Sequence, residues 1–153
     1  MYVREWMLLY RCSVRHGGIN VKIAVRYYSK SGNTKTIAEA IADGCGTQAV
    51  SITEEDKLQD KVDILFLGGA PYANIMAPEL REYANHLSSE QVNKVVLFTT
   101  SNWSHRTVYA LQKILREKGI KVEEEHFYAH MLRIRQRTDA AREFGKQKGA
   151  VKS

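Results

Sequence analysis

Cysteine is scarce in this sequence, and the cysteines are not placed as ligand pairs. The 153 residues contain two of them, Cys12 and Cys45, far apart and without a CxxC motif. This spacing excludes a disulfide framework and the common zinc and iron–sulfur patterns. We interpret both side chains as inert thiols of a protein in a reducing compartment, and we expect a cytoplasmic location.

Long apolar segments are absent as well. No apolar run approaches the ~18 residues that a membrane-spanning helix needs. The apolar stretch 6–10 is shorter than the hydrophobic region of a signal peptide, about 7–15 residues, and Arg11 follows it directly. The sequence therefore predicts no export signal and no membrane span. Because the domain pattern begins cleanly only at Val21, we interpret residues 1–20 as an N-terminal extension, and a non-native origin is one explanation for it.

Acidic side chains are outnumbered, so the chain carries a net charge of +6 and its pI is about 9.3. A basic surface favours acidic partners such as nucleic acid, an anionic membrane, an acidic protein or phosphorylated ligands. The densest basic stretch runs from Arg133 to Lys152, but no nucleic-acid-binding motif accompanies it. We therefore interpret it as a solvated helix face and predict no nucleic-acid partner.

The remaining composition is that of one globular domain, which we place at residues 21–153. Hydrophobic residues make up 44% and charged residues 26%, both ordinary values. Strand-like and helix-like patterns alternate along it. The predicted strands are 21–28, 48–52, 62–67, 94–99 and 120–128, and the predicted helices are 34–44, 78–87, 105–118 and 138–148. Residues 53–61 are polar and acidic and are expected to hold one helical turn at most. This alternation predicts an α/β fold with a doubly wound, five-stranded parallel sheet of order 2-1-3-4-5.

In such a sheet, ligands bind outside the carboxyl ends of the strands, near the point where the strand order reverses. The first loop at this edge is Ser29–Lys30–Ser31–Gly32–Asn33–Thr34, directly before a predicted helix. Its hydroxyl groups and the amides at the helix N-terminus would suit a phosphate group, and Gly32 would allow close approach of the backbone. The alternative is an ordinary capped turn.

Other anion-binding motifs do not fit this first loop. GxGxxG is absent after the first strand, which excludes the dinucleotide fingerprint, and GxxxxGK[ST] is absent as well. A cysteine phosphatase would need a cysteine where the loop has Ser29. A phosphorylated receiver domain would need acidic residues after the first strand and an aspartate at the end of the third, where this chain has Gly68–Gly69.

On these residues the chain resembles the flavodoxin family. The family signature [ST]-x-[ST]-G-x-T is met by Ser29, Ser31, Gly32 and Thr34. The stretches LFLGGAPYANIMAPELREYA and VVLFTTSNW resemble the two further flavin loops of the family, and the likeness extends over about residues 21–144. The resemblance implies a flavodoxin-like fold of the short-chain type and FMN as the cofactor.

The resemblance also implies a set of cofactor-binding residues. The phosphate of FMN would be held by Ser29, Ser31, Gly32, Asn33 and Thr34. One side of the isoalloxazine ring would be bordered by Gly69, Ala70, Pro71, Tyr72 and Ala73, and the other by Thr100, Ser101, Asn102 and Trp103. Tyr72 and Trp103 are the candidate stacking rings, and the alternative for both is simple loop packing. No catalytic residue and no metal site is predicted, and we interpret His105 as a surface or first-turn histidine.

These expectations favour an FMN-binding electron-transfer protein. One alternative is an FMN-dependent NAD(P)H:quinone-type reductase, and another is a module of the same fold that no longer binds flavin. The partner would be a redox protein or a small-molecule acceptor, and the oligomeric state stays open, with a dimer included. Carriers of the family usually present an acidic surface, so the basic charge of this chain predicts partners of the opposite sign or a small substrate.

Overall fold

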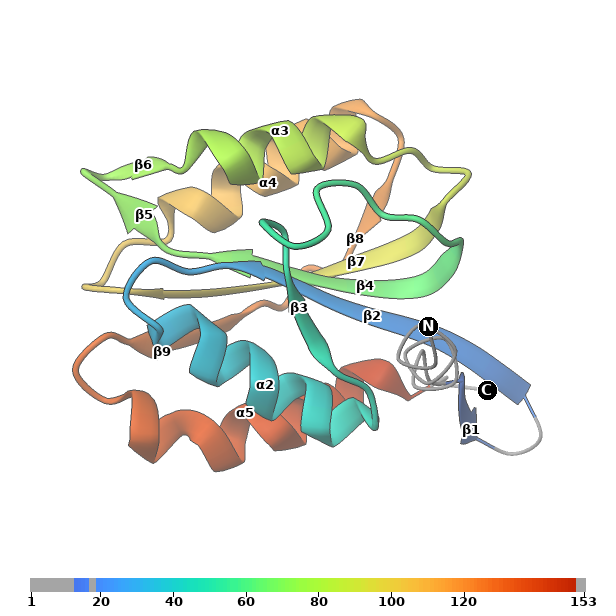
Figure 1. Cartoon of the computed structure of the whole chain (residues 1–153), viewed down its shortest axis with the longest axis horizontal. Helices are drawn as coiled ribbons and strands as arrows, with labels where there is room; N and C mark the ends of the chain where they lie inside the picture. The colour runs from blue at the N-terminus through green and yellow to red at the C-terminus, as the bar shows by residue number, and fades with distance from the viewer. Residues whose placement is uncertain (1–12, 17–18, 151–153) are drawn as a thin grey trace.

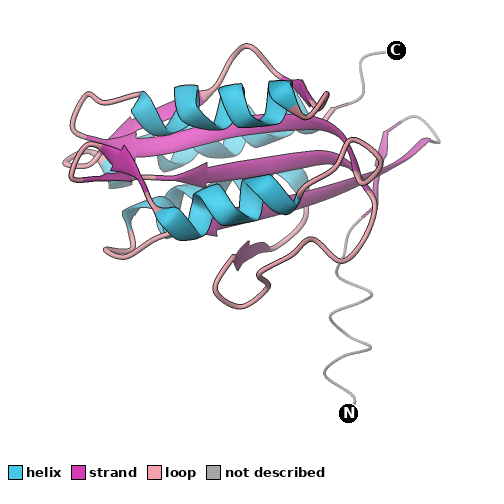
Figure 2. Ribbon diagram, turned by 90° about the horizontal axis from the view of Figure 1, so that it is seen from above, coloured by secondary structure: helices cyan, strands magenta, loops and turns pink. Residues whose placement is uncertain are grey.

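The central feature of the molecule is a mostly parallel β-sheet with helices on both faces (Figures 1 and 2). The computed structural model describes residues 13–16 and 19–150. The strands of this sheet are β1 (Ser13–His16), β2 (Ile19–Tyr28), β3 (Ala49–Ser51), β4 (Val62–Gly69), β7 (Val92–Ser101), β8 (Lys121–Val122) and β9 (Phe127–His130). A separate hairpin contains β5 (Pro71–Tyr72) and β6 (Ile75–Met76). The helices are α2 (Asn33–Cys45), α3 (Pro78–His86), α4 (Arg106–Glu117) and α5 (Ile134–Gly149). None of these described helices is long and apolar enough to cross a membrane.

The order of the parallel strands is the predicted one. β2 pairs with β3 on one side and with β4 on the other, β4 pairs with β7, and β7 pairs with both β8 and β9. All of these pairings are parallel, as helical crossovers require. Counted by position, the order is 2-1-3-4-5, and the predicted flavodoxin-like α/β fold is confirmed.

The fifth strand is split, whereas the sequence predicts one continuous strand over residues 120–128. The ladder to β7 stops after Val122 and resumes at Phe127, and β9 continues to His130. In the gap, Glu123 pairs with Lys94 at 3.2 Å and Glu125 pairs with Lys148 at 2.8 Å. These ion pairs join the edge to β7 and α5. The carboxyl half of the strand ends at His130, two residues beyond the predicted end.

A strand that the sequence did not predict lies at the amino end of β2. β1 pairs antiparallel with β2, in a register that sets His16 opposite Ile19. The sheet therefore includes residues of the predicted extension 1–20, because β2 begins at Ile19 rather than at Val21. The non-native origin of the extension stays a prediction, and residues 1–12 and 17–18 lie outside the described residues.

The core lies in two layers, one on each face of the sheet. Alternate residues of β2 face α2 and α5, as the period-two pattern predicts for Val21, Ile23, Val25 and Tyr27. The residues between them face the layer that contains α3 and α4. β4 and β7 are buried on both faces, which explains their near-continuous apolar sequences. Figure 1 shows the two helix pairs above and below the sheet.

Helices α2 and α5 cross in backbone contact. A Cβ atom on Gly145 would lie 2.3 Å from the carbonyl oxygen of Ile41, and one on Gly44 would lie 2.0 Å from that of Arg142. Gly44 therefore belongs to the helix contact, and it is Gly46 that ends α2, with φ of 73°. Next to this crossing, burial raises the pKa of the Cys45 thiol to about 12, which agrees with an inert role for this cysteine. Cys12 lies outside the described residues.

Candidate functional site

Three loops meet at the carboxyl edge of the sheet, and hydrogen bonds join them. The hydroxyl groups of Thr34 and Thr100 lie 2.8 Å apart, and both residues are buried, which joins the first loop to the third. The amide of Lys30 donates to the Tyr72 hydroxyl at 2.9 Å, which joins the first loop to the second. The Thr99 hydroxyl donates to the carbonyl of Gly69 at 2.7 Å, which joins the ends of β7 and β4. The structure thus brings the three predicted loops into one site.

The first loop presents a group of donors at the start of α2. Gly32 is the N-cap residue with φ of 94°, and no side chain caps the helix. The Ser29 hydroxyl accepts the amide of Gly32 at 3.0 Å and keeps its own proton for donation. The Ser31 side chain is exposed at the same turn. A Cβ on Gly32 would meet nothing within 4 Å, so the space above the loop is open. The loop therefore fits an anion of phosphate size.

Thr34 and Asn33, two of the predicted phosphate-binding residues, do not offer free side-chain hydroxyl groups to the phosphate. The Thr34 side chain is 1% exposed and its hydroxyl is bonded to Thr100, so this residue offers its backbone amide at the helix N-terminus rather than a free hydroxyl. Asn33 starts α2, and its amide lies 3.5 Å from the Ser31 hydroxyl oxygen. The cradle is consequently built mainly from backbone groups and the two serines.

The second loop is a tight hairpin rather than an open loop. β5 and β6 pair antiparallel, and the two turn residues, Ala73 and Asn74, both have positive φ, 50° and 63°. Two successive left-handed residues make the turn type that suits a two-residue hairpin. The hairpin carries Tyr72, whose ring packs edge-on against Tyr28 at 6.0 Å and lies under the Lys30 ammonium group at 4.5 Å.

Gly69 has a structural role at the beginning of this second loop. It is the last residue of β4 and is buried. A Cβ there would lie 2.7 Å from a methyl group of Leu80, so packing against α3 accounts for the glycine. Ala70 and Pro71 continue the chain into the hairpin and are partly exposed at the edge where the three loops meet.

The third loop is strained at its tip. Trp103 has φ of 69°, an uncommon conformation for a bulky residue, and its side chain is 76% exposed. Ser101 is buried and donates its hydroxyl proton to the carbonyl of Ser104 at 2.5 Å, which closes the turn. A residue stays in such a backbone conformation only where the surrounding structure holds it there. Residues of this kind are found most often at ligand-binding and active sites.

The support for this third loop comes from β9, and the sequence did not reveal it. The Tyr128 hydroxyl accepts the amide of Trp103 at 2.7 Å and donates to the carbonyl of Ser101 at 3.0 Å. The His130 ring lies 4.8 Å from the Trp103 ring, and its Nε2 atom is 3.0 Å from the Asn102 amide oxygen. The amide of Leu132 donates to Nδ1 of His130 at 3.1 Å, so Nε2 carries the proton that Asn102 accepts.

The signal that could have found these two residues is the strand period. Tyr128 and His130 are two apart in a strand, so their side chains share one face, at the end of the strand next to the third loop. The predicted strand stopped at residue 128, so this relation was lost. The structure thus adds Tyr128 and His130 to the residues that shape the site.

A pair of histidines lies behind Tyr128. His105 precedes the first residue of α4, is half-buried, stacks on Tyr128 at 4.6 Å, and its Nδ1 atom lies 2.8 Å from Nε2 of His126. Burial and the neighbouring His105 lower the pKa of His126. Within residues 21–150, no group of three or more histidine, cysteine, aspartate and glutamate side chains is placed to hold a metal ion. Through the stacking of His105 on Tyr128, the pair packs behind the residue that holds the third loop.

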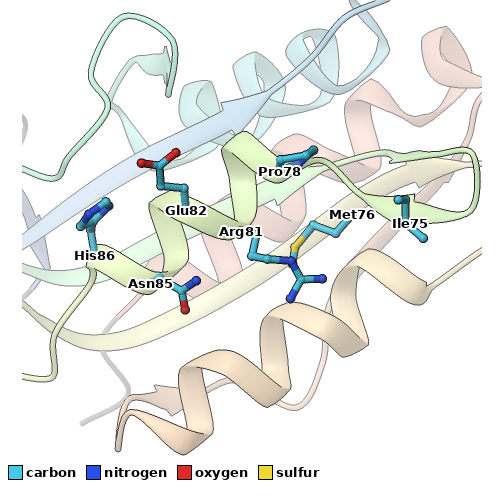
Figure 3. A pocket seen from close by; sticks show the side chains of 7 residues that line it. All are labelled: Ile75, Met76, Pro78, Arg81, Glu82, Asn85 and His86. Atoms are coloured by element: carbon cyan, nitrogen blue, oxygen red, sulfur yellow. The ribbon is translucent and has the colours of Figure 1, made fainter.

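A groove also lies along α3 and the strand before it (Figure 3). Figure 3 shows Glu82 and His86 on one side of the helix and Arg81 and Asn85 on the other. The groove is open, and its lining mixes both charge signs with Ile75 and Met76. Its lining includes Pro78 at the start of α3, but none of the predicted cofactor-binding residues lines it, so the groove is separate from the site of the three loops.

Comparison with known proteins agrees with this geometry. A family model described as a flavodoxin domain matches residues 24–144. No curated protein matches the sequence. The structure is similar to that of a flavodoxin, WrbA-like protein from Agrobacterium tumefaciens, with a TM-score of 0.67 and 19% identity, covering 83% of this chain and 94% of that one. It is also similar to oxidised Flavodoxin 1 from Bacillus cereus, with a TM-score of 0.66 and 17% identity, covering 80% and 93%. A flavodiiron protein from Giardia intestinalis is similar over 84% of this chain and 38% of its own, with a TM-score of 0.61 and 18% identity.

Proposed function

We propose that this chain, which belongs to the flavodoxin domain family, binds FMN at the three loops and transfers electrons between redox partners. The observation that carries the proposal is the juxtaposition of a phosphate-sized cradle with two aromatic-bearing loops. The cradle lies at the N-terminus of α2, and the hydroxyl pair Thr34–Thr100 and the contact between Lys30 and Tyr72 hold it against the other two loops. A ligand with a phosphate at one end and a flat ring at the other fits this arrangement.

Each part of the site has a task in binding. The Ser29 and Ser31 hydroxyl groups and the first amides of α2 would donate to the phosphate oxygens, where the partial positive charge of the helix terminus adds to the attraction. Tyr72 and Trp103 would border the ring system and reduce its contact with water. When bound, FMN would supply the one- and two-electron chemistry, and the protein would supply binding, orientation and electrostatics.

The polar groups of the third loop would tune the bound ring. The Trp103 amide and the Asn102 side chain are polar groups of the loop tip, and hydrogen bonds with Tyr128 and His130 hold them in position. Because a hydrogen bond that favours one redox state of the ring shifts its potential, the rigidity of this loop determines how strongly each electron is held. The chain needs no nucleophile or general base of its own for this role.

The first experiment is FMN retention by Ser31→Glu. The purified protein is mixed with FMN and desalted, and the flavin absorbance that remains with the protein is measured. Wild-type protein should retain the flavin. The variant should lose it, because a carboxylate about 4 Å from the phosphate repels it by roughly 1–4 kcal/mol between bulk water and a protein surface, or about fivefold or more in affinity.

The matched control is Ser89→Glu. Ser89 is exposed in a turn before β7, at the opposite edge of the sheet, and the substitution adds the same charge. If wild-type protein retained no flavin, the chain would be a module that lost the cofactor. If both variants retained flavin equally well, the phosphate would not lie in this loop. Oxidation of NAD(P)H by the flavin-loaded protein without a partner would instead support the reductase alternative.

A further inference from the structure

Four of the segments around the site together carry only basic charge, and Glu79 follows one of them at the start of α3. Residues 29–34, 70–77, 100–106 and 130–135 contain no aspartate or glutamate. They contain four cationic side chains, all exposed, which we call the basic rim: Lys30, Arg106, Arg133 and Arg135. Within residues 21–150, none of these four forms an ion pair with a carboxylate. Their charge therefore acts on whatever approaches this edge of the molecule.

Three large apolar side chains stand beside the basic rim, and we call them the apolar ridge. Trp103 is 76% exposed, Met131 46% and Leu132 80%. The two segments that carry them lie side by side, because the amide of Met131 donates to the carbonyl of Ser101 at 2.9 Å and the His130 ring packs against Trp103. Apolar side chains that gather at one exposed place, next to charged residues, mark an interaction surface. An ionic small molecule would gain little by contact with these exposed apolar side chains.

The opposite side of the same edge is acidic. Glu54 and Asp56 are exposed in the segment that follows β3, and β3 and β9 lie at opposite sides of the sheet. A flat anionic surface such as a membrane would meet both the basic rim and these carboxylates. A protein that docks on the β9 side would meet the ridge together with Arg106, Arg133 and Arg135. Lys30 lies nearer to β3, because it follows β2, which pairs with β3. This asymmetry favours a protein partner of limited footprint.

We propose that the apolar ridge and the basic rim together form the docking surface for an acidic electron-transfer protein. The inference rests on the proposed function, because it places the partner directly beside the loops that would border the flavin. A second copy of this chain is disfavoured, since a symmetric dimer through this surface would set the same cations against each other. The partner would be attracted by charge and then fixed by contact with Trp103, Met131 and Leu132.

The experiment measures the binding of two probe proteins to the FMN-loaded full chain. The probes are an acidic [2Fe–2S] ferredoxin and a basic cytochrome c, each titrated at low and at physiological salt. We expect the ferredoxin to bind and its affinity to fall as salt rises, because screening shortens the range of the attraction. Cytochrome c should bind at least tenfold more weakly at low salt. Equal binding of the two probes, or preference for cytochrome c, would overturn the proposal.

Variants locate the surface. Arg133→Glu/Arg135→Glu should weaken ferredoxin binding about tenfold or more, and Leu132→Ser should weaken it at both salt concentrations. The control Lys113→Glu/Arg116→Glu makes the same change of charge on the exposed face of α4 and should leave binding within about twofold. Equal loss in the two double variants would overturn the assignment, because only net charge would then matter.

Two further measurements separate the other occupants and the cofactor. If the chain sediments as a dimer that Leu132→Ser dissociates, or if it binds phosphatidylserine vesicles more tightly than ferredoxin, the surface belongs to a second copy or to a membrane and the proposal fails. Flavin absorbance is recorded for every variant. Loss of flavin from wild-type protein would contradict the proposed function, whereas retained flavin without ferredoxin binding would contradict the docking surface alone.

Discussion

The phosphate cradle and the third loop both place polar groups at the edge of the sheet, but different contacts hold them there. The cradle uses a glycine with φ of 94° and serines that bond within three residues of themselves. The third loop uses Trp103 with φ of 69°, which Tyr128 holds from another strand. The cradle is therefore stabilised locally, whereas the third loop depends on residues distant in the sequence.

The two regions meet at the hydroxyl pair Thr34–Thr100, so removal of one hydroxyl tests whether each region stabilises the other. Thr34→Val should lower the free energy of unfolding by about 1–3 kcal/mol, because the Thr100 hydroxyl is left buried without a partner. The measurement is urea denaturation of the flavin-free protein. The double variant Thr34→Val/Thr100→Val should lose less than the sum of the two single variants. Additive losses would show that the two loops are not coupled through this contact.

The third loop alone is tested by Tyr128→Phe. This change removes two hydrogen bonds, from the Trp103 amide and to the Ser101 carbonyl, but keeps the ring that His105 stacks on. The unfolding free energy should fall by about 1–2 kcal/mol, and FMN affinity should fall because the loop tip loses its support. Tyr109→Phe is the control, since Tyr109 is exposed on α4 and its hydroxyl forms no hydrogen bond with the described residues. Unchanged FMN affinity in Tyr128→Phe would mean that the third loop does not border the ring.

The difference between local and distant support explains how much of the molecule could be predicted. The strand over 21–28, the turn and the helix after it follow from period, hydroxyl content and glycine, because neighbouring residues determine them. The roles of Tyr128 and His130 arise only when β9 lies beside β7, and the break at Glu123 depends on Lys94 and Lys148 from other elements. Sequence patterns over a few neighbouring residues do not predict contacts between elements that are distant in the sequence.

The second loop shows the same limit at the level of the backbone. The proline of Ala70–Pro71 and the tolerance of Asn74 for left-handed conformations were visible in the sequence. The hairpin was not, because Ala73 also takes a positive φ that alanine rarely adopts. The segment shows its conformation only when β5 and β6 pair and Tyr72 reaches the Lys30 amide.

Backbone conformation gives predictions of opposite sign for the cradle and for the hairpin of the second loop. Gly32→Ala should destabilise the protein by about 1 kcal/mol, because φ of 94° is costly for any residue with a Cβ even where space is open. Ala73→Gly should stabilise it by less than about 1 kcal/mol, since relief of the positive φ is partly offset by the larger entropy of the unfolded chain. Thermal or urea unfolding measures both. The same sign for the two changes would refute the assigned turn conformations.

The smallest expected effect distinguishes the two regions by pH. The cradle side chains of serine, asparagine and threonine gain no charge in acid. The third loop is held by Tyr128, and His105 stacks on Tyr128 and contacts His126. Burial and His105 lower the pKa of His126 in the folded protein below its ordinary value of 6.5. Between 6.5 and that lowered value the unfolded chain binds more protons than the folded one, so stability should fall as the pH falls through this window and should be independent of this group above it.

Replacement of the titrating ring tests this mechanism. His126→Gln keeps a polar side chain that can face His105 but cannot gain a proton, so the variant should lose less stability than wild-type protein between about pH 7.5 and 5.5. His86→Gln is the control, because His86 is exposed on α3, far from β9 along the sheet order. A variant that lost as much stability as wild-type protein over this range would show that the acid sensitivity arises elsewhere. A smaller loss confined to His126→Gln would identify the histidine pair as the acid-sensitive part of the support for the third loop.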